Sequence, residues 1–139
     1  MKKESKFYQR IRKEFKKDFL LFRIEWGLGG TLGLPDLFII RKKEKAKVIL
    51  IELKIKVRNG KIKFGKFQIV FHKIVSKYLD NSFILVLHYI NNNSVNTSTQ
   101  STPKLYSSKD ISKLIIKNHE PITKATGYKK ILKWLINKS

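Results

Sequence analysis

The chain has 139 residues and carries 31 Lys and Arg against 10 Asp and Glu, which gives a formal net charge of +21. This length predicts one domain with its own hydrophobic core, and the charge predicts a polyanionic partner because such a surplus repels itself in a compact fold. Cysteine is absent, which excludes disulfides and thiolate zinc sites.

A first helix is expected over residues 4–18, where apolar side chains recur at spacings of three and four. Glu4 falls in the middle of this stripe and Glu14 falls at its border. A carboxylate that faces a core is costly unless a cation or a metal ion receives it. A solvated Glu in the first turn, where the helix dipole favours acid, explains Glu4 equally well. The stripe consists of Phe7, Tyr8, Ile11, Phe15 and Phe19.

Residues 21–26 alternate in the manner of a strand, with Arg23 and Glu25 on the face opposite to Phe22. One interpretation of Arg23 and Glu25 is a charge pair across a solvated edge, which is worth little. The glycines of residues 27–33 form a loop that allows close approach of backbone to a phosphate. This loop lacks the pattern of a nucleotide-binding P-loop.

Two apolar runs, 37–40 and 48–53, are separated by a charged turn and predict an antiparallel β-hairpin. Asp36 lies directly before the first run, and Glu52 and Lys54 lie at the end of the second. Residues two apart in a strand share a face, so Glu52 and Lys54 point the same way. The hairpin is therefore expected to bring two carboxylates and one ammonium group together.

After a basic loop, a second helix with an apolar face is expected from Lys66, and this helix is expected to pack around the sheet. Gln68 and His72 form a polar line at the edge of this face. We expect His72 to be a structural hydrogen-bonding residue and give it no catalytic role. The apolar face consists of Phe67, Val70, Phe71, Ile74 and Tyr78.

The continuous apolar run 82–90 predicts a central strand that is buried on both faces. Residues 91–102 are almost entirely Asn, Ser and Thr and predict a polar loop. A short return strand is expected at 104–106, and helices are expected within 107–138. We expect one domain over 1–139 whose core comes from about 4–90.

The segment Gly33-Leu34-Pro35-Asp36, followed after fifteen residues by Glu52-Leu53-Lys54, resembles the P-D…(D/E)-x-K superfamily of metal-dependent nucleases. Small stand-alone VRR-NUC-like domains and the archaeal and phage Holliday-junction resolvases are the most similar members. The resemblance covers about residues 4–89. The bare pattern is moderately specific, and its position on two β-rich runs behind a glycine-rich turn strengthens it. The alternative is a surface hairpin with an ordinary Glu–Lys pair.

The resemblance implies an α/β, restriction-endonuclease-like fold with a central mixed sheet, of four or five strands, flanked by helices. It also implies an endodeoxyribonuclease that leaves 5′-phosphate and 3′-hydroxyl ends. Asp36, Glu52 and the backbone carbonyl of Leu53 would bind Mg²⁺, for which Mn²⁺ can substitute. Lys54 would orient the attacking water and stabilise negative charge.

Related domains also suggest functions for residues outside the hairpin. An acidic residue on the first helix commonly completes the metal site, which makes Glu4 the first candidate and Glu14 the second. Similar domains place an Arg-x-Glu segment just before the Pro-Asp turn, so Arg23 and Glu25 are candidates to approach the scissile phosphate. A glutamine on the helix after the motif faces the active site in such domains, and Gln68 fits that position.

We expect the partner to be DNA, selected by shape because phosphate contacts carry the binding and no base-reading module is present. The expected function is resolution of branched DNA by a homodimer. The alternatives are a VRR-NUC-type flap or nicking nuclease and a non-catalytic basic nucleic-acid-binding protein. A site-specific restriction-type enzyme is a further alternative, but the sequence shows no separate recognition domain for it. No apolar run reaches the roughly twenty residues of a membrane span, and no signal peptide is visible, so a cytoplasmic protein is expected. The candidate DNA-binding residues are Arg23, Lys56, Arg58, Lys61, Lys63 and Lys66.

Overall fold

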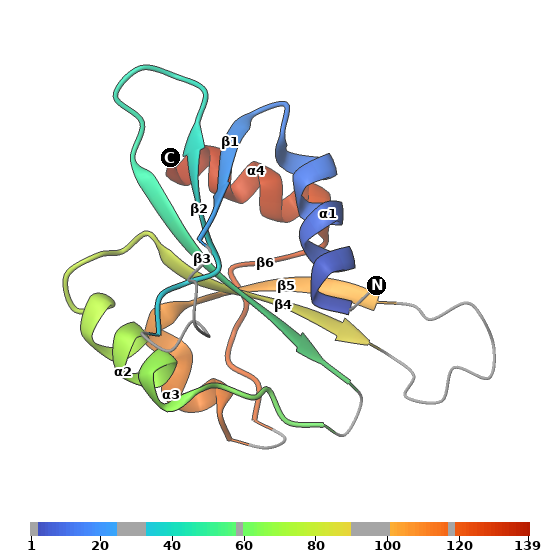
Figure 1. Ribbon diagram of the computed structural model, residues 1–139, viewed down its shortest axis with the longest axis vertical. Helices are drawn as coiled ribbons and strands as arrows, with labels where there is room; N and C mark the ends of the chain where they lie inside the picture. Colours follow the sequence, from blue (N-terminus) through green and yellow to red (C-terminus); the bar gives the residue numbers. More distant parts are fainter. Residues whose placement is uncertain (1–2, 25–32, 58–59, 90–100, 117–118) are drawn as a thin grey trace.

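The computed structural model describes residues 3–24, 33–57, 60–89, 101–116 and 119–139, with the side chains of residues 3 and 4 excepted. The fold is α/β, with helices on a mixed β-sheet, which confirms the predicted fold class (Figure 1). In chain order the elements are α1 (Lys3–Phe15), β1 (Phe19–Arg23), β2 (Leu37–Arg41), β3 (Val48–Lys56), α2 (Lys66–Val75), β4 (Ser82–Tyr89), β5 (Ser101–Ser107), the 3₁₀ turn η1 (Ser108–Asp110), α3 (Ile111–Leu114), β6 (Ala125–Thr126) and α4 (Tyr128–Lys138).

The sheet has six described strands in the order β1-β2-β3-β4-β5-β6, one more than the larger of the two numbers expected. Every neighbouring pair is antiparallel except β3 and β4, which are parallel. Parallel neighbours require a crossover connection, and α2 lies in this one. The expected return strand at 104–106 is confirmed and is longer, since β5 spans Ser101–Ser107.

The hairpin of β2 and β3 forms as predicted. Its register pairs Leu37 with Ile51, so one step further along the ladder Asp36 lies opposite Glu52. Leu37 and Ile51 are completely buried because they face the first core, and the register therefore cannot slip by one residue without exposing them.

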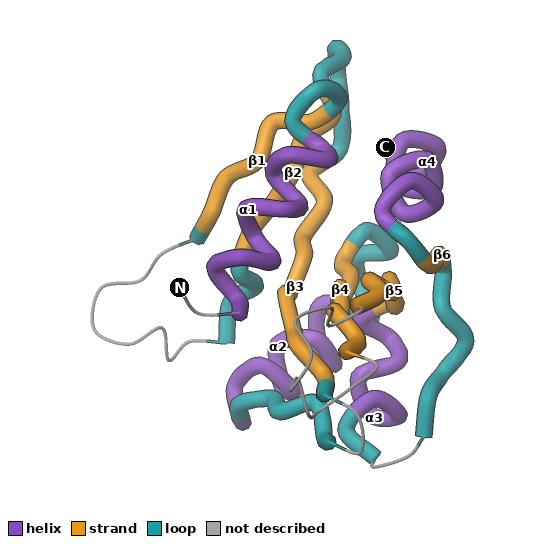
Figure 2. Tube along the Cα trace, turned by 90° about the vertical axis from the view of Figure 1, so that its right-hand side faces the viewer, coloured by secondary structure: helices purple, strands orange, loops and turns teal. Residues whose placement is uncertain are grey.

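Helices cover both faces of the sheet. The helices α1 and α4 pack on one face, and α2 with α3 packs on the other (Figures 1 and 2). The first core extends beyond residue 90, because Leu105, Ile131 and Leu135 are completely buried in it. The second core contains Ile62, Ile84, Val86, Tyr106, Ile111 and Leu114.

The helix α2 packs on the sheet as predicted, but its apolar face points outward. Phe67, Val70, Ile74 and Tyr78 are 57%, 47%, 52% and 81% exposed, whereas His72 is completely buried. The physical reason lies in the strand beneath the helix, because the residues that β3 presents there, Glu52 and Lys54, are polar and contact Gln68.

In β1, Phe22 faces outward and stacks on Phe38 with ring centroids 4.9 Å apart. Phe19 is buried in the first core and Leu21 packs against it. Arg23 shares their face, and its guanidinium lies 4.9 Å from the ring centroid of Tyr8 in α1. Across the described ranges, no helix is long and apolar enough to cross a membrane.

Candidate active site

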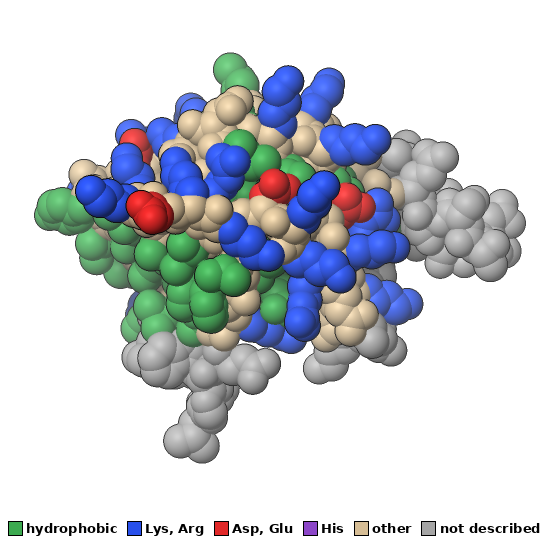
Figure 3. Space-filling view, turned by 90° about the horizontal axis from the view of Figure 1, so that it is seen from above, with side chains coloured by type: hydrophobic (Ala, Val, Ile, Leu, Met, Phe, Trp, Pro, Cys, Tyr) green, Lys and Arg blue, Asp and Glu red, His purple; other side chains and the backbone are tan. Residues whose placement is uncertain are grey.

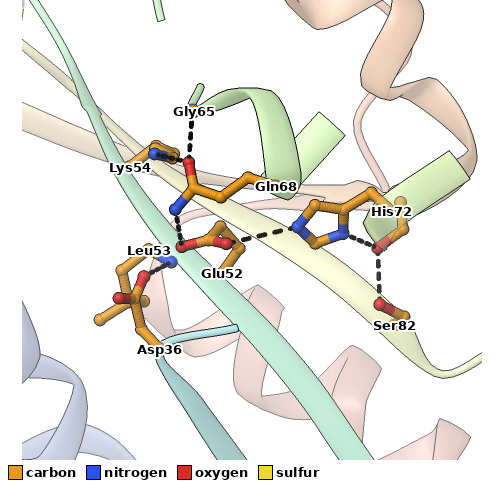
Figure 4. Close-up of polar contacts among 9 residues, drawn as sticks. Asp36, Glu52, Leu53, Lys54, Gly65, Gln68, His72 and Ser82 are labelled. Carbon is orange, nitrogen blue, oxygen red and sulfur yellow. Dashed lines mark hydrogen bonds and ion pairs between the residues drawn. The ribbon is translucent and has the colours of Figure 1, made fainter. Parts of the chain in front are cut away.

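Asp36, directly before β2, is held by hydrogen bonds from the segments on either side of it, the end of β1 and the strand β3. Its backbone carbonyl accepts the N–H of Ile24 at 2.8 Å, and its side-chain Oδ2 accepts the N–H of Leu53 at 2.7 Å. The carboxyl group of Asp36 is thereby tied to the backbone of β3. These two bonds hold the Asp36 carboxyl against β3, beside Glu52 (Figure 4).

Glu52 is only 1% exposed, which is rare for a carboxylate and requires polar partners. Its Oε2 lies 3.4 Å from Nε2 of Gln68, and its Oε1 lies 3.4 Å from Nε2 of His72. Both partners come from α2, so the inward face of this helix is a polar surface for Glu52.

Gln68 links the second carboxylate to the lysine. Its Oε1 accepts the Nζ–H of Lys54 at 2.8 Å and the backbone N–H of Gly65 at 2.8 Å. Because two donors meet at this oxygen, the amide NH₂ must be the group that faces Glu52. The lysine Nζ also lies 4.9 Å from the ring centroid of Phe64. The predicted placement of Glu52, Lys54 and Gln68 in one site is thus observed.

The two acids repel one another. Burial, a side-chain hydrogen bond with Glu52 and repulsion from its charge raise the pKa of Asp36 to about 8, although the Leu53 N–H and Lys54 act in the opposite direction. Near neutral pH the pair therefore retains a proton when no cation is present. A divalent cation would replace this proton and relieve the repulsion.

His72 is neutral in this site. Burial, followed by the charge of Lys54, lowers the pKa of His72 to about 4. The 3.4 Å contact between His72 Nε2 and Glu52 Oε1 is short enough to count as an ion pair, but a neutral imidazole makes it an ordinary hydrogen bond. The other ring nitrogen, Nδ1, lies 2.8 Å from Oγ of Ser108, which in turn lies 2.7 Å from Oγ of Ser82.

Gly33 packs the loop before Asp36 directly against α2. Its φ of 75° lies in the left-handed region, and a Cβ at this position would lie 2.3 Å from the carbonyl oxygen of Phe67 and 2.8 Å from the N of Gln68. Only glycine permits this approach. The first turn of α2 is thereby held close to the Asp36 turn.

Of the other candidate residues except the lysines, Arg23 lies beside this centre, Glu14 lies apart from it, and the rest fall outside the described part. Glu14 binds Nε of Arg10 at 2.9 Å on α1, as a helix-surface pair. Arg23 and Asp36 line the same shallow pocket, together with Tyr8, Leu37 and Leu53. The side chain of Glu4, and residues Glu25 and Arg58, lie outside the described residues.

Lys61, Lys63 and Lys66 are exposed on the segment that leads into α2, and Lys56 is partly exposed at the end of β3. Sequence reasoning missed Ser82 and Ser108 and the contact of His72 with Glu52. A histidine four residues after Gln68 was the one available signal, because such residues share a helix face.

The donor set fits a hard divalent cation. Among the described side chains no group of three His, Cys, Asp or Glu residues forms a metal cluster. Two carboxylates are nevertheless the usual protein contribution to a Mg²⁺ site, because Mg²⁺ keeps several waters in its shell. Comparisons with protein-family models, curated proteins and solved structures give no match. The functional argument therefore rests on the residues and geometry of this chain.

Proposed function

We propose that the protein is a divalent-metal-dependent endodeoxyribonuclease. The observation that carries this proposal is the assembly of Asp36, Glu52, Lys54 and Gln68 at one place on the sheet. A solvated Glu–Lys pair on a surface hairpin is a poor description, because Glu52 is 1% exposed and meets Lys54 through Gln68. A protein that used its charge alone would have no need for this buried arrangement.

In the proposed reaction, Asp36, Glu52 and the carbonyl of Leu53 would hold Mg²⁺ or Mn²⁺. When bound, the ion lowers the pKa of water and neutralises charge that builds on the phosphoryl oxygens. Lys54 orients the attacking water and stabilises that charge, and Gln68 keeps the lysine Nζ in place. The water oxygen loses a proton to solvent and forms a bond to phosphorus, while the bond to the 3′ oxygen breaks and this oxygen takes up a proton from solvent, which leaves 5′-phosphate and 3′-hydroxyl ends.

The proposed partner is DNA. Lys and Arg side chains are spread over the face seen in Figure 3, with few acidic side chains between them. A net charge of +21 favours a polyanion, and phosphate contacts position a protein on DNA without reading its sequence. Lys61, Lys63 and Lys66 precede or begin the helix that carries Gln68, so they would contact phosphates beside the cleaved bond.

Within this function we favour branched DNA and a homodimer. Symmetric cleavage of a four-way junction requires two active sites related by a twofold axis, so a chain of this size must pair with a copy of itself. The outward face of α2 (Phe67, Val70 and Ile74) together with Tyr78 in the turn that follows, defined here as the outer stripe, supplies exposed apolar surface for that pairing. A flap or nicking nuclease of the VRR-NUC type is the alternative.

A panel of four-way junction, flap, replication-fork and linear duplex substrates tests the proposal. Cleavage should require Mg²⁺ or Mn²⁺, stop with a chelator and be poorly supported by Ca²⁺, whose coordination is looser. The junction should be cut fastest. A monomer that cuts linear duplex as fast as a junction would exclude junction resolution and leave a general or flap-directed nuclease. Full activity in excess chelator would exclude the metal.

A further inference from the structure

The buried polar side chains form one connected chain. Among the residues that the structure describes, these side chains are Glu52, His72, Ser82 and Ser108, which are between 0% and 2% exposed. They come from β3, α2, β4 and η1, and successive members lie within 3.4 Å of one another. Figure 4 shows this chain running away from Glu52 on the side opposite Asp36.

The donors and acceptors of these four side chains determine the direction of each hydrogen bond between them. An ionised Glu52 can only accept, so Nε2 of His72 carries the proton and donates to Oε1. The Nδ1 atom of this neutral imidazole then accepts from the hydroxyl of Ser108 at 2.8 Å. The oxygen of Ser108 is left to accept from the hydroxyl of Ser82 at 2.7 Å. Each donor therefore has one acceptor, and the ionised carboxylate of Glu52 fixes the tautomer of His72.

Burying these polar side chains lowers the stability of a small fold. The helix α2 buries the polar His72 and exposes the outer stripe, although an apolar side chain inside and polar ones outside would be the cheaper choice. The bonds of the chain offset part of this cost. Sequences tend to break local rules of this kind at functional sites.

The geometry points to His72 as a positioning residue, which Ser108 and Ser82 hold in the orientation that fixes the carboxylate of Glu52 for metal binding. His72 holds Oε1 and Gln68 holds Oε2, so the plane of the carboxylate is set by two donors from one helix. The inference rests on the proposed function, since it assigns Glu52 to the metal. His72 itself would touch neither the metal nor the DNA.

Electron paramagnetic resonance can measure the binding of Mn²⁺ to the full-length protein without DNA. This measurement separates a positioning role of His72 from a role in folding. The variant His72→Leu removes the donor and should raise the Kd for Mn²⁺ by about 10- to 100-fold, as other residues that orient metal ligands do. In His72→Gln the amide NH₂ reaches the same point, and the Kd should stay within about threefold of the wild type. His88→Leu is the matched control, because His88 lies on the neighbouring strand β4 and bonds Tyr106 instead of the acids.

Thermal unfolding of each variant shows whether a change in Kd follows from loss of the fold. If His72→Leu does not fold, the double variant Ser82→Ala and Ser108→Ala keeps the imidazole and removes its support. It should then weaken Mn²⁺ binding by about three- to tenfold. Folded variants that bind Mn²⁺ as tightly as the wild type overturn the positioning role alone. A wild-type protein that neither binds Mn²⁺ nor cuts DNA overturns the proposed function together with this inference.

Discussion

At the scale of single residues, Asp36 couples the stability of the fold to pH. Its pKa rises from 3.8 to about 8 in the folded protein, mainly because of burial and then because of Glu52. Between these values the folded protein keeps a proton that the unfolded chain releases. The contribution of Asp36 to the stability of the metal-free protein should therefore be fully present below about pH 4 and should be lost as the pH rises to 8.

The substitution Asp36→Asn tests this coupling, because it removes the charge and keeps an oxygen that can accept from Leu53. In chelator at pH 8 it should raise the Tm by on the order of 5 °C, and the gain should disappear near pH 4. Asp80→Asn is the control, since Asp80 is exposed and bonds Lys138 at 3.2 Å. Unfolding curves of Asp36→Asn that run parallel to the wild type at every pH would contradict the assignment.

At the scale of elements, the position of α2 depends on its contact with Gly33. In Gly33→Ala the new Cβ would meet the backbone of Phe67 at 2.3 Å in a conformation that favours glycine. We expect a fall in Tm of about 5 °C or more and a loss of cleavage, because α2 must move and Gln68 moves with it.

Gly65→Ala is the matched control for this prediction. The φ of Gly65 is −68°, which any residue adopts. A Cβ at Gly65 would lie 3.6 Å from Gln68 Oε1, its nearest neighbour, which is an ordinary van der Waals contact. Its backbone N–H would still donate to Gln68. The Tm should change by less than about 2 °C and cleavage should persist. Equal losses in both variants would show that α2 is not held in place by Gly33.

The elements also show why sequence reasoning succeeded in one place and failed in another. The β2–β3 hairpin was predicted because both strands and their turn lie within about twenty residues, and alternation fixes which side chains share a face. The face of α2 could not be assigned in the same way. Helical periodicity identifies a stripe but does not say which neighbour covers it, and here the neighbour of α2 is the polar face of β3 that carries Glu52 and Lys54.

The remaining parts of the site depend on long-range contacts. Ser108 lies 36 residues from His72 in sequence, and His72 lies 20 residues from Glu52. A single serine, whether Ser82 at the start of an apolar run or Ser108 in a polar segment, has no pattern that distinguishes a buried partner from a solvated one. The strand β5 was underestimated for a related reason, since Ser101 and Thr102 continue the composition of the preceding polar segment.

At the scale of the whole molecule, the net charge should be visible in the salt dependence of DNA binding. Lys61, Lys63 and Lys66 are proposed phosphate contacts, and each contact releases counterions. Their triple substitution by Ala should reduce the slope of log Kd against log salt by about 2 to 3. Fluorescence anisotropy in chelator, where no cleavage occurs, measures this slope.

The matched control is the triple Ala variant of Lys129, Lys130 and Lys133. These lysines are also exposed and their substitution removes the same charge, but α4 covers the opposite face of the sheet. The slope should change by less than about 1. If the two triple variants behaved alike, binding would reflect net charge and not a defined DNA path beside the site.

The outer stripe of α2 should determine the oligomeric state. Ile74→Glu places a charge in the stripe and should convert the proposed dimer into a monomer, because a buried unpaired charge is costly in an interface. Sedimentation measures the change. Ile122→Glu is the control, since Ile122 is 91% exposed and lies outside α2. A wild-type protein that sediments as a monomer at high concentration would contradict the pairing.

The central claim is that Asp36, Glu52 and Lys54 cut DNA with the help of a divalent cation. The most direct measurement is cleavage of a labelled four-way junction in Mg²⁺ by the wild type, Glu52→Gln and Lys54→Ala, with the affinity for the same DNA measured in chelator. We predict cleavage by the wild type alone, while the affinities of all three stay within about tenfold of one another. Cleavage by Glu52→Gln at the wild-type rate would contradict the claim.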